Sequence, residues 1–118
     1  MKYKSFHDME VWQQAMNLSV EIFEISKSLP KCEDYGLTSQ IRRSANSVCA
    51  NIAEAFGRNT GPDKSRMYVI AKGSAYETQS HIIYGTRVKY FDYEITNILV
   101  ENYETLIKGI NKIIKSLK

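Results

Sequence analysis

Apolar residues recur at intervals of three and four along most of the chain, which is the spacing of one face of an α-helix. This pattern predicts four helices, over about residues 9–29, 37–56, 61–88 and 93–117. The two prolines, Pro30 and Pro62, both lie where the periodicity breaks, as expected at helix boundaries. No stretch of useful length alternates apolar and polar residues, so the pattern indicates an all-α chain.

The predicted helices are similar in length, roughly 30–39 Å each at about 1.5 Å per residue. Four matched helices with short connections predict an antiparallel up-down-up-down four-helix bundle that forms a single domain over residues 1–118. We expect Thr60 and Asp92 to cap the third and fourth helices. Gly57 is a natural place for the second helix to stop in the left-handed conformation.

The first helix carries two apolar stripes. The main stripe comprises Val11, Ala15, Leu18, Ile22, Ile25 and Leu29. A second stripe on a neighbouring face comprises Trp12, Met16, Val20 and Phe23. One stripe suffices for packing within a bundle, and exposing a second one would be costly, so we predict that the second stripe is an oligomer interface. The alternative is a broad buried face within one subunit.

The third helix has an unusual inner face, made mostly of small residues that would let a neighbouring helix approach closely. Gly73 and Gly85 each weaken this helix by roughly 1 kcal/mol relative to alanine. We therefore expect a packing reason for both glycines.

A stripe of polar residues runs along one side of the second predicted helix, and we expect it to face polar residues of the third. We predict a structural hydrogen-bond network formed by Arg43, Ser47, Asn51, Glu54, Ser74 and Glu77. Such networks specify register and partner more than they add stability. The alternative is that the arginines near this stripe, Arg42, Arg43 and Arg58, reach a ligand.

The net charge is +3, and it is spread unevenly. Residues 1–60 are neutral, whereas residues 61–118 carry nine Lys/Arg against six Asp/Glu. The candidate nucleic-acid contacts are Arg43, Arg58, Lys64, Arg66, Lys72, Lys108, Lys112 and Lys115, accompanied by Tyr68, Tyr76 and Tyr84. Basic residues interleaved with aromatic ones suit phosphate contact and base stacking. The alternative is that the lysines of the fourth helix form a solvated face that complements the helix dipole.

The residues offer little support for catalysis. His7 and His81 lack the Glu-x-x-His pairs of a di-iron bundle, and Cys49 has no basic partner nearby in sequence. We therefore predict no catalytic residue, no metal site and no cofactor. No apolar run of about 18 residues and no secretory signal are present, so we expect a cytoplasmic protein with no membrane partner and two reduced cysteines.

Three segments carry a resemblance to a known family. They are FHDMEVWQQAMNL near the start, YGLTSQIRRSANSVCANIAEAFGR in the second helix and AKGSAYETQ in the third. The chain resembles the four-helix bundle family encoded in intervening sequences of bacterial large-subunit (23S) ribosomal RNA genes. It departs from the family pattern at Cys49, where proline is usual, and at Ala55, where glycine is usual.

The resemblance implies a small antiparallel bundle that assembles into a homopentameric ring. The family's gene location suggests association with ribosomal RNA, and a related accessory protein of diversity-generating retroelements engages nucleic acid and a reverse transcriptase. We therefore expect a non-enzymatic oligomeric scaffold that binds structured RNA through basic residues. The alternative is a protein-interaction module, a ring that docks a partner enzyme such as a reverse transcriptase, with no direct RNA role.

Overall fold

The computed structural model describes residues 3–118. Its four α-helices are α1 (Glu10–Ser26), α2 (Leu37–Phe56), α3 (Gly61–Arg87) and α4 (Tyr93–Ser116). Two short 3-10 helices, η1 (Phe6–Asp8) and η2 (Lys31–Glu33), precede α1 and α2 respectively. No strand occurs in this part of the chain, which confirms the all-α class. The molecule measures 44 × 25 × 20 Å along its principal axes.

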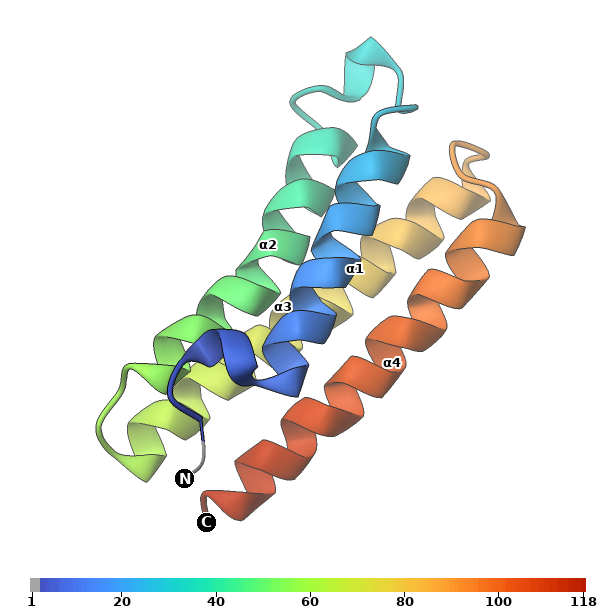
Figure 1. The fold of residues 1–118 in the computed structure, drawn as a ribbon. Helices are drawn as coiled ribbons and strands as arrows, with labels where there is room; N and C mark the ends of the chain where they lie inside the picture. Colours follow the sequence, from blue (N-terminus) through green and yellow to red (C-terminus); the bar gives the residue numbers. More distant parts are fainter. Residues whose placement is uncertain (1–2) are drawn as a thin grey trace.

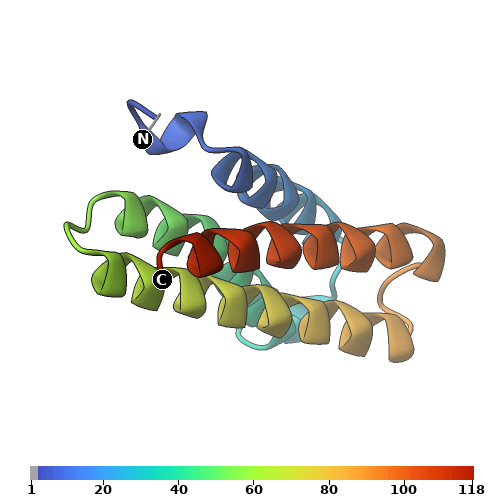
Figure 2. The ribbon, with the colours of Figure 1, turned by 90° about the horizontal axis from the view of Figure 1, so that it is seen from below.

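Each helix packs beside the next one in the sequence, and α1 also contacts α4. The α1–α2 and α3–α4 connections lie at one end of the molecule, and the α2–α3 connection lies at the other end with the C-terminus (Figure 1). Helices α1 and α3 share no packing interface and lie on opposite sides of the described molecule (Figure 2). Their outward faces therefore point in different directions.

One core runs through all four helices, and the predicted apolar stripes supply most of it. The fully covered side chains include Ala15, Ile22, Ile41, Ala45, Val48, Ile52, Ala71, Ala75, Ile82, Tyr103, Leu106 and Ile110. The small inner face predicted for α3 is buried from Met67 to Gly85. At the start of α4, Ile95 lies four residues before the buried Leu99 but is itself about half exposed (52%), so the core does not reach this end of the helix fully.

The first helix is shorter than expected and ends at Ser26 rather than at residue 29. The backbone N–H groups of residues 27–29 each bond the carbonyl three residues earlier, which tightens the chain into a turn. Pro30 explains this end, because it disfavours the helical conformation in the residue before it. The other predicted helices agree with the structure to within one residue at each end.

The two predicted N-terminal caps form as expected, whereas the predicted C-terminal end of α2 does not. Thr60 Oγ1 accepts the Asp63 N–H at 3.2 Å, and Asp92 Oδ1 accepts the Glu94 N–H at 3.2 Å. The prediction for Gly57 is wrong, because its φ of −84° is right-handed. The chain tightens there through bonds from the N–H groups of Gly57 and Arg58 to carbonyls three residues back, so no left-handed residue is needed.

Candidate nucleic-acid interface

The arginines at the α2–α3 junction are neutralised by carboxylates of their own chain. Arg58 bonds Glu54, one turn earlier on α2, and its Nη1 lies 4.0 Å from Asp63 Oδ2. Arg66 Nη2 lies 3.7 Å from the other oxygen of Asp63. The hydrogen bond with Glu54, followed by that carboxylate's charge, raises the pKa of Arg58. These groups therefore present a balanced cluster of charges rather than a strong positive patch.

Three more of the predicted contacts are engaged within the chain. Lys64 Nζ donates to the carbonyl oxygens of Ala55 and Phe56, at 3.1 and 3.2 Å, and so satisfies the C-terminal end of α2. Lys72 Nζ donates to Asn111 Oδ1 at 3.0 Å, and Arg43 pairs with Glu77. Any phosphate at these positions must compete with an existing partner.

The lysines of α4 are different. Lys108, Lys112 and Lys115 are exposed, and none has an ion pair or side-chain hydrogen bond within residues 3–118. Their spacing of four and three residues places all three on one face of the helix, over roughly 10 Å at 1.5 Å per residue. The acidic residues Glu94, Glu101 and Glu104 occupy the first half of α4, so the positive charge is confined to its second half.

The three tyrosines of α3 that were candidates for base stacking differ in their exposure to solvent. Tyr68 is only 4% exposed, its hydroxyl lies 3.9 Å from Met9 Sδ, and burial raises its pKa. It is therefore part of the core and not a surface for base stacking. Tyr76 and Tyr84 are about half exposed, on the outward face of α3.

Hydrogen bonds divide the predicted polar network into separate groups. Arg43 and His81 both contact Glu77, with 3.3 Å between His81 Nε2 and Glu77 Oε2. Asn51 Nδ2 donates to Ser47 Oγ at 3.0 Å, and Ser47 Oγ lies 2.9 Å from Ser74 Oγ. Glu54 instead pairs with Arg58 within α2. The groups that join α2 to α3 therefore act as a lock between the two helices.

The predicted network omits one hydroxyl pair of this lock, Ser44 and Thr78. Ser44 lies in the core and accepts a hydrogen bond from Thr78 Oγ1 at 2.8 Å. Thr78 also donates to the Ser74 carbonyl, in the manner of a helical threonine. The usable signal in the sequence is the spacing of Ser44, because it lies three residues after Ile41 and four before Val48 and so falls on the apolar stripe of α2, where a hydroxyl needs a partner from the facing helix.

The second apolar stripe of α1 divides into a covered half and an open half. Trp12 is half-buried beneath the N-terminal segment. The centre of its ring lies 5.2 Å from the ring centre of Phe6 and 5.6 Å from that of His7. Met16 is also partly covered, whereas Val20 is 51% and Phe23 is 46% exposed. Phe23 has two cationic neighbours, because the guanidinium carbon of Arg42 lies 4.5 Å and Lys27 Nζ lies 5.2 Å from its ring centre.

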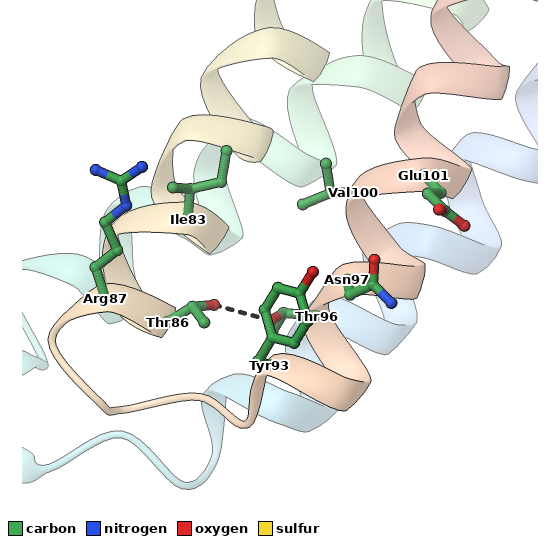
Figure 3. A pocket seen from close by; sticks show the side chains of 8 residues that line it. All are labelled: Ile83, Thr86, Arg87, Tyr93, Thr96, Asn97, Val100 and Glu101. Carbon is green, nitrogen blue, oxygen red and sulfur yellow. Dashed lines mark hydrogen bonds between the residues drawn. The ribbon is translucent and has the colours of Figure 1, made fainter.

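A pocket of about 330 Å³ opens between the C-terminal end of α3 and the start of α4. Ile83 and Val100 supply aliphatic walls, and the hydroxyls of Thr86 and Thr96 bond each other at 2.8 Å (Figure 3). Arg87 points away from Tyr93 (Figure 3). The pocket offers a recess of mixed polarity, without a nucleophile held against a base.

Within residues 3–118, no three His, Cys, Asp or Glu side chains gather closely enough to hold a metal ion. The same residues include no helix with the length and apolar character needed to cross a membrane. Cys32 is exposed and Cys49 is buried, and both are free thiols. Burial raises the pKa of Cys49, which keeps it protonated.

Residues 7–112 match the family model of the 23S rRNA-intervening sequence protein. The chain belongs to this family. A solved structure of a protein with unknown function, from the S23 ribosomal protein family of Bacteroides thetaiotaomicron, is similar at 26% sequence identity with a TM-score of 0.82. The alignment covers 89% of this chain and 98% of that one. A search of curated proteins found no match.

Membership of the 23S rRNA-intervening sequence family agrees with the resemblance found in the sequence. The departure at Cys49 is accommodated without a break, because α2 runs continuously from Leu37 to Phe56. Cys49 Sγ lies 3.3 Å from the Asn46 carbonyl oxygen, as a buried helical thiol commonly does.

Proposed function

We propose that this 23S rRNA-intervening sequence family protein is a non-enzymatic, cytoplasmic scaffold that binds structured RNA, such as ribosomal RNA, through α4. The observation that carries the proposal is the set of unpaired lysines Lys108, Lys112 and Lys115. Phosphate contacts by free lysines release counterions from the nucleic acid, which makes the binding favourable at low salt. The family description, which names 23S rRNA, supports RNA as the nucleic acid.

The proposed scaffold is an up-down-up-down bundle that assembles into a homo-oligomer, a pentamer by family resemblance. The placement of successive connections at opposite ends supports the bundle topology (Figure 1). The exposure of Val20 and Phe23 supports self-association, because large apolar side chains gain free energy when a partner covers them. Assembly would repeat the lysine face of α4 in every subunit, so a modest charge would become a strong collective one.

Filter binding against ribosomal RNA fragments at two salt concentrations tests the proposal. Replacing Lys112 and Lys115 by glutamine should weaken binding at low salt. It should also reduce the slope of log affinity against log salt by about 1 per lysine and per contacting subunit. Binding that is absent at low salt, or that is indifferent to salt, contradicts an RNA role.

A matched control uses Lys31→Gln and Lys89→Gln, which remove the same charge at the far end of the molecule (Figure 1). Both lysines are exposed and lie in the α1–α2 and α3–α4 connections. The control variant should bind RNA nearly as the unaltered protein does. An equal loss in both variants would show that net charge, rather than the lysine face of α4, governs binding.

The second candidate function is a protein-interaction ring that docks a partner enzyme, such as a reverse transcriptase, without contacting RNA. It is favoured by the internal engagement of Arg43, Arg58, Lys64, Arg66 and Lys72. Co-purification of a partner protein that survives nuclease treatment would support it. Loss of that partner on nuclease treatment would favour the RNA-binding function.

A further inference from the structure

The outward side of α3 is apolar along most of its length, although α3 lies on the surface. Between Arg66 and Arg87 the residues that are exposed as a whole carry no charge, and the Glu77 side chain beside them, which is 38% exposed, is paired with Arg43. The residues exposed as a whole, which we call the α3 face, are Val69, Ile70, Gly73, Tyr76, Ser80, Ile83 and Tyr84. Its large side chains are between 42% and 54% exposed. Monomers rarely leave so continuous an apolar surface open.

Gly73 adds a second, independent observation. A glycine inside a helix costs about 1 kcal/mol relative to alanine. A Cβ built on Gly73 meets nothing within 4 Å, so no contact inside the described molecule explains the glycine. At the centre of an apolar surface, its missing side chain leaves a shallow site where the backbone of another helix can approach closely.

The outward side of α1 has complementary properties. Its exposed charged residues are Glu10, Glu21 and Glu24, of which Glu24 pairs with Lys27, directly after the helix, at 3.2 Å. Val20 and Phe23 are the large apolar side chains exposed among them. The α3 face ends at Arg66, which is paired with Asp63, and at Arg87, which has no ion pair within residues 3–118. The apolar centres of the two surfaces therefore match, and the positive charge of Arg87 is opposite in sign to the carboxylates of α1 that have no ion pair within the same residues, Glu10 and Glu21.

We propose that the α3 face receives α1 of a second copy of the chain. This inference rests on the proposed self-association and specifies its two surfaces. Because α1 and α3 lie on opposite sides of the molecule, the contact is head-to-tail, and each copy can use both surfaces at once (Figure 2). Such heterologous contacts form rings when the rotation between copies closes. The pocket beside Ile83 gives the α3 face a recess for a large side chain of the arriving helix.

Sedimentation velocity without RNA tests the proposal through two single variants. Ile83→Glu places a charge on the α3 face, and Phe23→Glu places one on α1. Both positions are open to solvent in the lone chain, so each variant should keep the helical circular dichroism of the unaltered protein. Each should sediment as a 13.6 kDa monomer, whereas the unaltered protein sediments as a larger oligomer. The control Ala50→Glu, at an exposed position of α2, should leave assembly unchanged.

Mixing the two variants gives the decisive measurement. The Ile83→Glu chain still has an intact α1, and the Phe23→Glu chain still has an intact α3 face. An equimolar mixture should therefore form one-to-one dimers that cannot grow further. A mixture that stays monomeric overturns the α1-to-α3 pairing, and so does normal assembly of either variant or an unaltered protein that is already monomeric.

The outcomes are separable from those of the RNA proposal. A protein that binds RNA in a salt-dependent way but never assembles would overturn this inference and leave the α4 lysines in place. A protein that assembles as described and ignores RNA at low salt would do the reverse.

Discussion

The interface between α2 and α3 (the α2–α3 seam) and the interface between α1 and α4 (the α1–α4 seam) differ in how closely their helices pack. Helices α2 and α3 share the most extensive packing in the molecule, with small residues on their inner faces and hydroxyl pairs between them. Two of these pairs, Thr78 with Ser44 and Ser47 with Ser74, have oxygen–oxygen distances of 2.8 and 2.9 Å. They fix the register of two backbones that approach closely.

The α1–α4 seam is close only near one end, where the Gly109 backbone lies beneath Val11. Further along, it opens into a polar pocket of about 210 Å³ and then into another of about 280 Å³ near the α3–α4 connection. The difference indicates that α2 and α3 form the rigid half of the bundle. Helices α1 and α4, which pack less extensively on each other, have more freedom to adjust their relative position.

The largest expected effect on stability comes from enlarging a side chain in the closely packed α2–α3 seam. Ala75 is fully buried on α3, so Ala75→Leu should cost about 3 kcal/mol of unfolding free energy through overpacking. Thr105→Leu adds a similar side chain beside the polar pocket of the open seam, where it should change stability by less than about 0.5 kcal/mol. Urea unfolding followed by circular dichroism measures both. Equal losses would show that the two seams are equally tight.

The two glycines of α3 test its inner and outer sides separately. A Cβ on Gly85 would lie 2.5 Å from the Phe91 ring, so Gly85→Ala should destabilise the fold by about 1–3 kcal/mol. Gly73→Ala should instead stabilise it by about 1 kcal/mol. Both are best measured in the Ile83→Glu background, where self-association through the α3 face is blocked. Destabilisation by Gly73→Ala there would reveal an intramolecular reason for that glycine.

A smaller effect of opposite sign is expected at Tyr103. Its hydroxyl is fully buried and has no hydrogen-bond partner within residues 3–118. Burial raises its pKa, with smaller contributions from Cys49 and Glu21. Removing an unsatisfied buried hydroxyl relieves a desolvation cost, so Tyr103→Phe should raise the unfolding free energy by about 1 kcal/mol. A lower thermal midpoint for this variant would indicate that the hydroxyl is satisfied in solution.

Much of this architecture was predictable from spacing alone. The four helices follow from apolar periodicity, and the caps at Thr60 and Asp92 follow from residue type. The packing reason expected for Gly85 is the Phe91 ring. The end of α1 differs from the prediction because the apolar stripe continues through Leu29, while Pro30 acts on the backbone before it.

The candidate sites were harder to predict, because they depend on which charges meet across helices. Nothing in local sequence shows that Lys64 reaches back to two carbonyls of α2, or that Arg43 finds Glu77. The α3 face was overlooked for a related reason. Periodicity identifies only an inner stripe, and the basic residues around Tyr76 and Tyr84 favour a base-stacking interpretation, whereas the structure places both tyrosines in an apolar surface.

The smallest expected effect concerns the contact that joins the two connections at one end of the bundle. Glu33 accepts the Leu37 N–H and, at 2.8 Å, the Tyr90 hydroxyl. The backbone bond first and the phenol second lower the pKa of Glu33 below its ordinary 4.5, and the same contact raises the pKa of Tyr90 to about 12. The ionised carboxylate and the neutral phenol are therefore the stabilising forms.

Tyr90→Phe should lower stability modestly between about pH 5 and pH 9, where both stabilising forms exist. The lowered Glu33 pKa means that its contribution is present above about pH 4.5 and is lost as the pH falls through the folded-state value. The raised Tyr90 pKa means that its contribution is lost as the pH rises from 10 towards 12. The gap in urea midpoint between the two proteins should therefore shrink at pH 3. A gap that stays constant from pH 3 to pH 7 would show that the phenol acts through packing, and that no charge-dependent bond joins the two connections.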